Sequence, residues 1–282
     1  MEEYVSLATL AQTDAKTPIP KDKLLPVISS PPFLALPGTF NARDLGLVPG
    51  SPIRPGLVYR SGGFFMCPVL PEEAKTYLSQ TLGVKKVFDL RSVREQARAP
   101  DPSFGQGIEG VWEKPDEEDA HVDLSEFVEG EGEKGYITMY MDVLKIYQGA
   151  IKKVLQWVRD GEGAPFLFHC TAGRDRTGVM AGILLTLAGA DPNTIALDWT
   201  LTRIGSEPAR EELIAFALKG SFAEDTEAPG FDNLVNLRVS CWEAFIEAAQ
   251  EKYGGLEGYV TGTLGFSDED VARIKDNLVL RN

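Results

Sequence analysis

The alternation of short apolar runs with longer periodic segments predicts an α/β fold. Two runs, LVYR at residues 57–60 and VKKVFDL at 84–90, are typical of strands, and the second is rich in Val and ends near Asp89. Between them, PEEAKTYLSQTLG has helical spacing and stops at Gly83. A third apolar run, at residues 166–168, precedes an apolar helical segment.

Further helices are expected in the second half of the chain. Residues 136–159 repeat apolar side chains at intervals of three and four, which predicts one amphipathic helix that packs on a sheet. Helical patterns return at 191–203, 206–219 and 233–253. In the final segment, SDEDVARIKDNLVL, Ser267 is the candidate N-cap.

The chain is expected to form one large domain preceded by an arm. Its 282 residues, 43% of them hydrophobic, suffice to bury a full core. Residues 1–37 are assigned to a Pro-rich N-terminal arm, because the six prolines between residues 14 and 37 favour an extended segment lying across the body. Residues 38–282 are assigned to a single domain with a helical C-terminal region.

An acidic, glycine-rich stretch interrupts this domain at residues 105–135. It predicts a long excursion that is either a lid or a solvated loop. The solvated loop is the favoured reading, because runs of charge usually face water.

Composition argues against several classes of partner. The net charge is -14, which disfavours nucleic acids and anionic membranes, so an anionic substrate needs a local positive site. The N-terminus lacks the features of a signal or transit peptide, and no apolar run is long enough to span a bilayer. Three cysteines form no even framework, which favours a reduced, cytoplasmic location.

The sequence predicts neither a metal site nor a bound cofactor. The chain has only two histidines, His121 and His169, and it contains no CxxC or HExxH spacing.

The strongest chemical signal is the segment APFLFHCTAGRDRTGVMAGILL. Its loop, Cys170 to Arg176, joins a strand end to a helix start, where unpaired backbone N–H groups and the positive end of the helix dipole attract an anion. This field stabilises a thiolate, which makes Cys170 a candidate nucleophile. Arg176 offers a planar fork for two phosphate oxygens. The loop is therefore predicted to bind a phosphoryl group, which the loop amides and Arg176 neutralise without a metal or cofactor.

Neighbouring residues complete the predicted chemistry. Asp175 is a candidate for protonating the leaving oxygen and then activating water, and Thr177 for donating its hydroxyl to the sulfur. Gly173 lets the loop curl so that successive N–H groups converge. His169 is expected to orient the loop through ring hydrogen bonds rather than to transfer protons. The residues assigned to substrate binding in and beside the loop are His169, Thr171, Ala172, Gly173 and Arg174.

The segment HCTAGRDRTG resembles the Cys-x5-Arg signature of the protein tyrosine phosphatase superfamily, and HC-x-AG-[KR]-D-RTG in particular resembles the bacterial and fungal tyrosine/lipid phosphatases. The likeness extends to four further segments and covers most of residues 38–281; they are TFNARDLG at 39–46, IRPGLVYRSG at 53–62, VFDLRSVRE at 87–95 and ALDWTLTR at 196–203. It implies a central mixed sheet of about four or five strands flanked by helices. It also implies hydrolysis of phosphate monoesters through a phosphocysteine intermediate.

In such enzymes the cysteine is the nucleophile, the arginine binds phosphate and the loop aspartate is implicated as the proton donor. These roles transfer to Cys170, Arg176 and Asp175. The aspartate of the DLRS segment lies near the pocket in relatives, so the resemblance makes Asp89 the second candidate acid. The chain departs from the family where Arg174 replaces a lysine and where Trp199 replaces a tyrosine.

Two residues outside the loop, Arg43 and Arg60, are also assigned to substrate binding. A buried salt-bridge network under the sheet is an equally good explanation of both.

The substrate stays open between a phosphotyrosine protein, a phosphoinositide and a small phosphorylated metabolite. The extra charge of Arg174 favours a substrate with more than one anionic group, whereas the acidic surface disfavours membrane-bound polyphosphoinositides. A phosphate-binding pseudophosphatase and a sulfur-transfer or arsenate-reducing enzyme are the alternatives. The first is disfavoured because the cysteine, the aspartate and the arginine are all present, and the second because of the RTG continuation.

Overall fold

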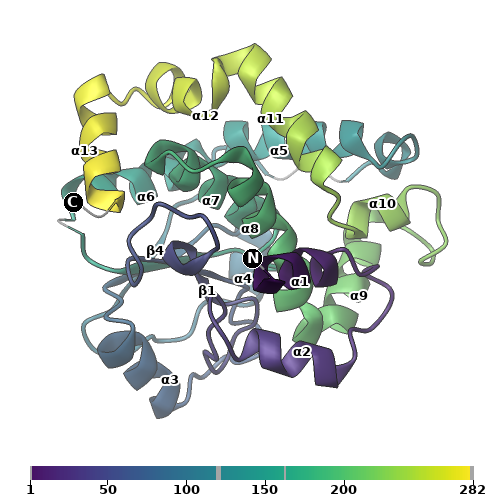
Figure 1. The fold of residues 1–282 in the computed structure, drawn as a ribbon, viewed down its shortest axis with the longest axis horizontal. Coiled ribbons are helices and arrows are strands. Elements are labelled where there is room, and N and C mark those ends of the chain that lie inside the picture. The colour runs from purple at the N-terminus through teal and green to yellow at the C-terminus, as the bar shows by residue number, and fades with distance from the viewer. Residues whose placement is uncertain (1, 119–121, 162, 280–282) are drawn as a thin grey trace.

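The computed structural model describes residues 2–118, 122–161 and 163–279, and a five-stranded sheet lies at its centre (Figure 1). The strands in spatial order are β1 (Arg43–Asp44), β2 (Val58–Ser61), β5 (Phe166–His169), β3 (Lys86–Asp89) and β4 (Glu109–Trp112). The first pair is antiparallel and the other pairs are parallel. The predicted α/β fold with a mixed sheet is confirmed.

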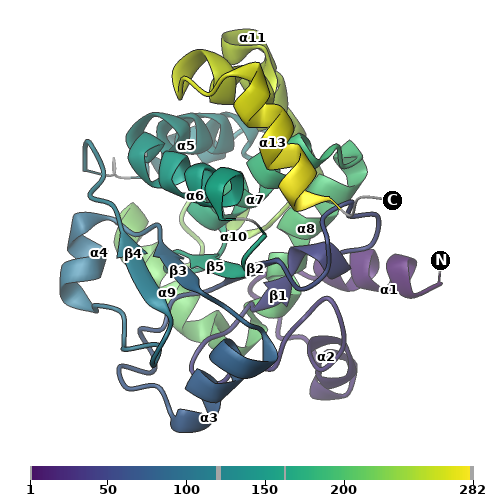
Figure 2. The same cartoon turned by 90° about the vertical axis from the view of Figure 1, so that its left-hand side faces the viewer.

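The sheet separates two apolar clusters, because successive side chains of a strand point to opposite faces. In β5, Phe166 and Phe168 join the larger cluster, whereas Leu167 joins the smaller one. Figure 2 shows the sheet edge-on between these two layers. The larger layer is built by α5 (Glu133–Ile146), α6 (Gln148–Asp160), α7 (Asp175–Ala188), α8 (Pro192–Gly205), α11 (Val239–Tyr253), α12 (Gly255–Gly258), η5 (Tyr259–Thr263) and α13 (Asp268–Leu278).

The smaller layer lies under α3 (Glu72–Thr76) and the π-helical turn η2 (Tyr77–Thr81), which contribute Ala74 and Leu78 to its core. The remaining elements are α1 (Glu2–Ala11), α2 (Lys21–Ile28), η1 (Leu45–Leu47), α4 (Val93–Arg98), η3 (Leu124–Phe127), η4 (Glu207–Ala209), α9 (Arg210–Ser221) and α10 (Phe231–Val235). Several of these elements pack on helices, as α1 and α2 do on α8 and η3 does on α5.

Two helices differ from their predicted lengths. The helix predicted at 136–159 is broken at Tyr147, whose φ of -102° and ψ of 24° separate α5 from α6. The segment predicted at 233–253 is likewise divided between α10 and α11. The apolar periodicity of the sequence continues through both breaks, because the helices on either side of each break all bury apolar side chains. Ser267 does cap α13, as part of a capping box with Asp270.

The acidic excursion at 105–135 is more structured than a solvated loop, since its described residues include β4 and η3. Phe127 of η3 is buried in the larger core. His121 lies outside the described residues.

The prediction of an extended arm over residues 14–37 is wrong. Residues 21–28 form α2, and Ala15 and Ile19 are buried in the larger core. Arg203 of α8 donates to the carbonyl oxygens of Thr13, Asp14 and Thr17 at 2.9, 3.1 and 2.7 Å, which fixes this turn against the body. The prolines did not prevent a helix; Pro20, for example, stands at the N-cap of α2, where no intrahelical N–H bond is required. The domain boundary at residue 37 stays a prediction.

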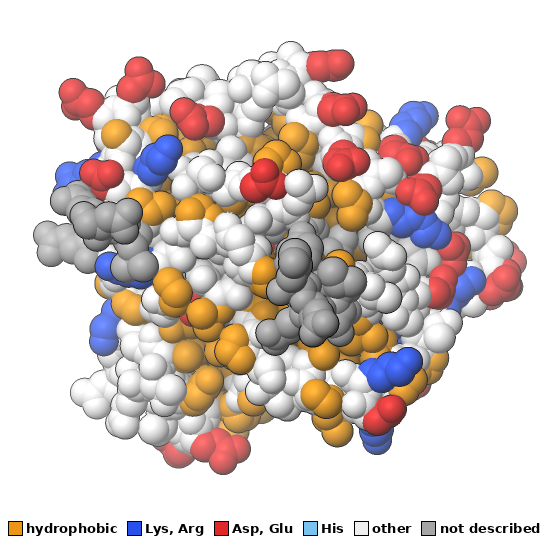
Figure 3. All heavy atoms as spheres, viewed as in Figure 1, with side chains coloured by type: hydrophobic (Ala, Val, Ile, Leu, Met, Phe, Trp, Pro, Cys, Tyr) orange, Lys and Arg blue, Asp and Glu red, His pale blue; other side chains and the backbone are white. Residues whose placement is uncertain are grey.

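Figure 3 shows one face of the molecule, with acidic side chains around much of its margin and basic ones between them. Apolar side chains are visible over the middle of this face. The acidic margin accords with the net charge of -14.

The burial of the N-terminal segment predicts that Ile19→Ala destabilises the protein by about 2–5 kcal/mol, because a buried side chain is lost and a cavity is left. Urea unfolding monitored by tryptophan fluorescence measures this change. The control is Leu25→Ala in α2, where the side chain is 53% exposed and a change within about 0.5 kcal/mol is expected. Equal, small effects of both substitutions would mean that this segment contributes nothing to the core.

Candidate active site

The carboxyl ends of the parallel strands bring the predicted residues to one edge of the sheet. Ser61 of β2 and Asp89 of β3 are both in register with His169 of β5. Cys170 follows β5 directly, and α7 begins at Asp175. Ligands of open α/β sheets bind outside this carboxyl edge. The strand, loop and helix order predicted from the sequence is confirmed.

The conformation of the loop requires glycine at position 173. Gly173 has a φ of +64°, and a Cβ atom there would lie 2.4 Å from the carbonyl oxygen of Ser61. The Gly173 carbonyl accepts hydrogen bonds from Arg60 Nη2 at 2.7 Å and from Asn41 Nδ2 at 3.0 Å. The curl of the loop is therefore held from behind by two side chains of the β1–β2 region.

An ion-pair network behind the loop fixes those side chains. Asp198 of α8 accepts from Arg43 Nε at 2.8 Å and also pairs with Arg60. Burial raises the pKa of Asp198, but the two guanidinium groups outweigh it and lower the pKa overall. Burial and the neighbouring Arg60 lower the pKa of Arg43 to about 10.

Neither Arg43 nor Arg60 is exposed to solvent. The assignment of both to substrate binding is therefore corrected, because a fully buried guanidinium does not reach a ligand in the cavity. Both arginines instead belong to a buried salt-bridge network that supports the loop, which was the alternative explanation from the sequence.

Arg176 is held by a carboxylate that the sequence analysis did not assign. Glu95 of α4 accepts from both terminal nitrogens of Arg176, at 2.8 Å from Nη2, and it also accepts the hydroxyl of Thr171. Tyr147, at the break between α5 and α6, accepts from Arg176 Nη1 at 3.2 Å. Burial raises the pKa of Glu95, but the ion pair with Arg176 outweighs this effect and holds the pKa of Glu95 well below its usual range.

The candidate nucleophile is buried, since Cys170 is only 1% exposed.

A sequence signal for Glu95 did exist. Ser92 and Glu95 form a capping box at the start of α4, and the S-x-x-E spacing is visible in the VFDLRSVRE segment. The S-x-x-E pattern predicts the start of a helix, but it does not predict that the Glu95 carboxylate also accepts hydrogen bonds from Arg176.

Asp175 lies at the end of a hydrogen-bond relay. Its Oδ1 accepts from the Tyr140 hydroxyl at 3.0 Å and from Arg174 Nε at 2.8 Å, and Tyr140 in turn accepts from Trp199 Nε1 at 2.8 Å. Because the indole N–H only donates, the proton of Tyr140 is directed at Asp175. Burial raises the pKa of Tyr140 well above its ordinary value, as does the nearby Asp175 carboxylate to a smaller extent.

Arg174 is not an additional uncommitted cation. Besides its ion pair with Asp175, it donates through Nη1 to the carbonyl oxygen of Leu234 at 3.1 Å. The argument that Arg174 favours a substrate with several anionic groups is therefore weakened.

Thr177 is fully buried at the first turn of α7. Its hydroxyl has no hydrogen-bond partner among the residues that the structure describes. The predicted hydrogen bond to the Cys170 sulfur is accordingly not formed in this conformation.

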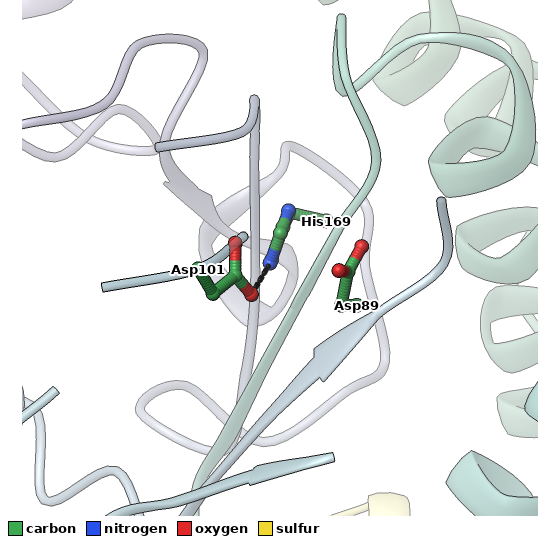
Figure 4. A group of neighbouring side chains, drawn as sticks. All are labelled: Asp89, Asp101 and His169. Carbon is green, nitrogen blue, oxygen red and sulfur yellow. Dashed lines mark hydrogen bonds and ion pairs between the residues drawn. The ribbon is translucent and has the colours of Figure 1, made fainter. Parts of the chain in front are cut away.

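A cluster of polar side chains, Asp89, Asp101 and His169, lies beside the loop (Figure 4). His169 Nε2 is 2.9 Å from Asp101 Oδ2, and His169 Nδ1 is 3.2 Å from the Cys170 carbonyl oxygen. Arg91 pairs with Asp101 at 2.7 Å and donates to both carboxylate oxygens of Asp89 at 2.8 Å. Burial lowers the pKa of His169, but Asp101 outweighs it and raises the pKa overall. A protonated His169 donates from both ring nitrogens.

One ligand atom from each of Asp89, Asp101 and His169 falls within 4.8 Å of the others, a spacing that suits a metal ion. The Arg91 guanidinium already pairs with both carboxylates, so a cation would have to displace it. The expectation of a site without metal stays a prediction.

A cavity of about 600 Å³ opens in front of the loop. Ala172, Arg174, Asp175 and Arg176 lie at its wall, together with Glu95. The apolar residues among the rest of its lining come mainly from the 122–127 region, α5, α9 and the α10 region, and include Val122, Phe127, Met139, Val143, Ile146, Leu213, Ile214, Phe216, Leu234, Val235 and Leu237. The acidic excursion therefore forms one wall of the candidate site.

The fold and this site define a phosphatase with a Cys-x5-Arg loop. The model of the tyrosine phosphatase family matches residues 34–280, and the chain belongs to that family. It is thus a cysteine-dependent phosphatase that acts on phosphorylated substrates.

Curated relatives agree with this assignment. The chain is 29% identical over 204 residues to a tyrosine-protein phosphatase of Nostoc commune, covering 70% of this chain and 67% of that protein. It is 28% identical to the triple specificity protein phosphatase PtpB of Mycobacterium tuberculosis, over 86% of this chain and 98% of that protein. A solved structure of the catalytic core of the yeast PP-IP phosphatase Siw14 covers 61% of this chain and 92% of its own, at 15% identity and a TM-score of 0.32. Within the described residues, no helix is long and apolar enough to cross a membrane.

The grip of Glu95 on Arg176 predicts that Glu95→Gln lowers kcat/KM for an aryl phosphate by about 10- to 100-fold, because a hydrogen bond to a charged group contributes about 1.5–3 kcal/mol. Glutamine retains the capping box, so helix α4 is expected to stay folded. Steady-state kinetics with p-nitrophenyl phosphate measure the effect. Arg98→Gln, an exposed change on the same helix, serves as the control, and equal kcat/KM in the two variants would refute the positioning role.

Proposed function

We propose that the chain hydrolyses phosphate monoesters, of the phosphotyrosine type first, through a phosphocysteine intermediate on Cys170. The observation that carries this proposal is the position of Cys170 at the start of a loop that Gly173 curls and that ends at Arg176 in the first turn of α7. Backbone N–H groups and the dipole at such a helix start stabilise both a thiolate and a bound phosphoryl group.

The two steps follow from the groups around the loop. In the first, the Cys170 thiolate attacks phosphorus, the bond to the leaving oxygen breaks, and Asp175 gives its proton to that oxygen. In the second, Asp175 takes a proton from water as the water oxygen attacks phosphorus, and the thiolate departs. Arg176, oriented by Glu95, stabilises the charge on the equatorial oxygens in both steps.

Asp175 is a better candidate for the general acid than Asp89. The Asp175 side chain is 22% exposed, lines the cavity, and receives its two hydrogen bonds on Oδ1. Asp89 is only 4% exposed, and Arg91 contacts both of its oxygens. We propose a supporting role for Asp89, which anchors Arg91 and through it the Asp101–His169 pair.

The loop residues Thr171, Ala172 and Gly173 are proposed to bind phosphate through their backbone N–H groups, and His169 is proposed to orient the loop. The protein partner of this reaction would be a phosphorylated protein, with a phosphoinositide or a small metabolite as the alternative substrate. A pseudophosphatase is disfavoured by the full set of reacting groups. A reduced, cytoplasmic compartment suits a mechanism that needs a free Cys170 thiol.

Replacement of the nucleophile tests the mechanism. Cys170→Ser is expected to abolish turnover of p-nitrophenyl phosphate without added metal, because a serine hydroxyl in this loop is far less ionised than a thiol. Phosphate release assays measure turnover, and thermal unfolding checks that the variant is folded. Turnover by the folded variant would exclude the phosphocysteine route, and a wild type that binds phosphate without turnover would point to the pseudophosphatase.

The choice of acid is tested by the leaving group. Asp175→Asn is expected to lower kcat for phenyl phosphate by about 10²–10⁴-fold and to affect p-nitrophenyl phosphate less, because the more acidic phenol leaves with little help from a proton donor. Tyr140→Phe should change the same ratio in the same direction, more weakly, since it removes one hydrogen bond to Asp175.

Asp89→Asn is the matched control, and it should lower both substrates by a similar factor. A stronger leaving-group dependence in this variant than in Asp175→Asn would assign the acid to Asp89.

A further inference from the structure

The charges that line the cavity are already paired. Every arginine among the described lining residues contacts a carboxylate, and no described lysine lies in the lining. The pairs are Arg94 with Glu118 at 2.6 Å, Arg174 with Asp175 at 2.8 Å, Arg176 with Glu95, Arg203 with Glu207 at 2.6 Å, and Arg210 with Glu207 at 3.5 Å. The pair of Arg94 with Glu118 is weak, because the two side chains are 69% and 60% exposed, whereas the other four arginines pair with carboxylates that are at most 22% exposed.

The lining contains further carboxylates, which belong to Asp123, Glu126 and Asp142. A second or third phosphate group on a ligand would approach these carboxylates. Glu126 pairs with the exposed Lys134 at 3.7 Å, but no lysine belongs to the described lining, so most of this repulsion stays. An ion-paired arginine can still contact a phosphate, as Arg176 is proposed to do. The described lining, however, carries five arginines and six carboxylates, so a second phosphate group meets net repulsion there.

Much of the remaining wall is apolar, and α9 and α5 are two of the elements that supply it. From α9 come Leu213 and Ile214, which are partly buried, and Phe216, which is 41% exposed. From α5 come Met139 and Val143. A volume of about 600 Å³ falls in the range of sites that enclose a ligand of drug size, and such sites bind largely by apolar contact.

We infer that the cavity selects phosphate monoesters that carry a single phosphate on a large apolar leaving group, and that it rejects polyphosphorylated substrates. The inference rests on the proposed function, since it concerns the substrate of the same loop. The specificity-determining groups are the apolar wall of α9 and α5, which takes the leaving group, and the excess of carboxylates over arginines in the described lining, which repels a second phosphate.

A matched pair of substrates tests the apolar wall. Phenyl phosphate and biphenyl-4-yl phosphate have leaving groups of similar acidity, so they differ mainly in apolar size. The wild type is expected to turn over the biphenylyl ester with a kcat/KM at least about tenfold higher, because the second ring buries apolar surface. Equal values, or a lower value for the larger ester, would overturn the inference.

Ile214→Asp places a charge in the wall and is expected to reduce that preference ratio about tenfold. The control is Ala215→Asp, one residue along α9 on an exposed position that does not line the cavity, and it should leave the ratio unchanged. An equal reduction in both variants would mean that net charge rather than the wall sets the preference, and it would overturn the role of α9.

A polyphosphorylated substrate tests the repulsion by the acidic lining. Phosphate release from an inositol trisphosphate by the wild type is expected to be at least about 100-fold slower, as kcat/KM, than release from biphenyl-4-yl phosphate. Glu118→Gln frees Arg94 from its ion pair and should raise the trisphosphate value severalfold. A wild type that prefers the trisphosphate overturns this inference but leaves the proposed function intact. Absence of turnover of p-nitrophenyl phosphate overturns the proposed function itself.

Discussion

The salt bridges of Asp198 with Arg43 and Arg60 hold the loop on which the proposed chemistry depends. The guanidinium of Arg60 contacts both Asp198 and the Gly173 carbonyl, so a buried charge on α8 helps to fix the path of the loop backbone. Three charges buried together are tolerated only when each is paired and hydrogen-bonded. The network therefore holds one particular geometry of the loop, through the hydrogen bond from Arg60 to the Gly173 carbonyl.

A second ion pair acts from the front of the loop. Glu95 fixes the guanidinium of Arg176 and the hydroxyl of Thr171, and its own position is fixed by the capping box with Ser92. The loop is thus clamped between α4 in front and α8 behind. Such rigidity matters for catalysis, because donors that are already oriented toward the transition state need no reorganisation when charge develops.

The same pairing of charges bears on the anion-binding role that we propose for the loop of an acidic protein. The overall charge of -14 repels anionic ligands at long range, and the arginines around the cavity are balanced by carboxylates. Attraction for a phosphate is therefore concentrated at the N-terminus of α7, where backbone dipoles and Arg176 act together. This arrangement links the composition of the chain to the kind of substrate that its cavity accommodates.

The sequence by itself determined the α/β class and the loop between β5 and α7 that carries Cys170, Asp175 and Arg176. These depend on local order along the chain, such as a strand, a glycine-containing loop and a helix start, which a linear pattern records. The sequence also supplied the family resemblance that the match over residues 34–280 bears out.

Only the tertiary structure decided which distant groups meet the loop. Nothing in the local pattern relates Glu95 to Arg176, or Trp199 to Asp175 through Tyr140, because these contacts join elements separated by many residues. Burial is equally non-local. Arg43 and Arg60, predicted to bind substrate, are buried and support the loop, and Ala15 and Ile19 of the Pro-rich segment belong to the core. The sequence does not show this, because the exposure of a side chain depends on which other elements pack over it.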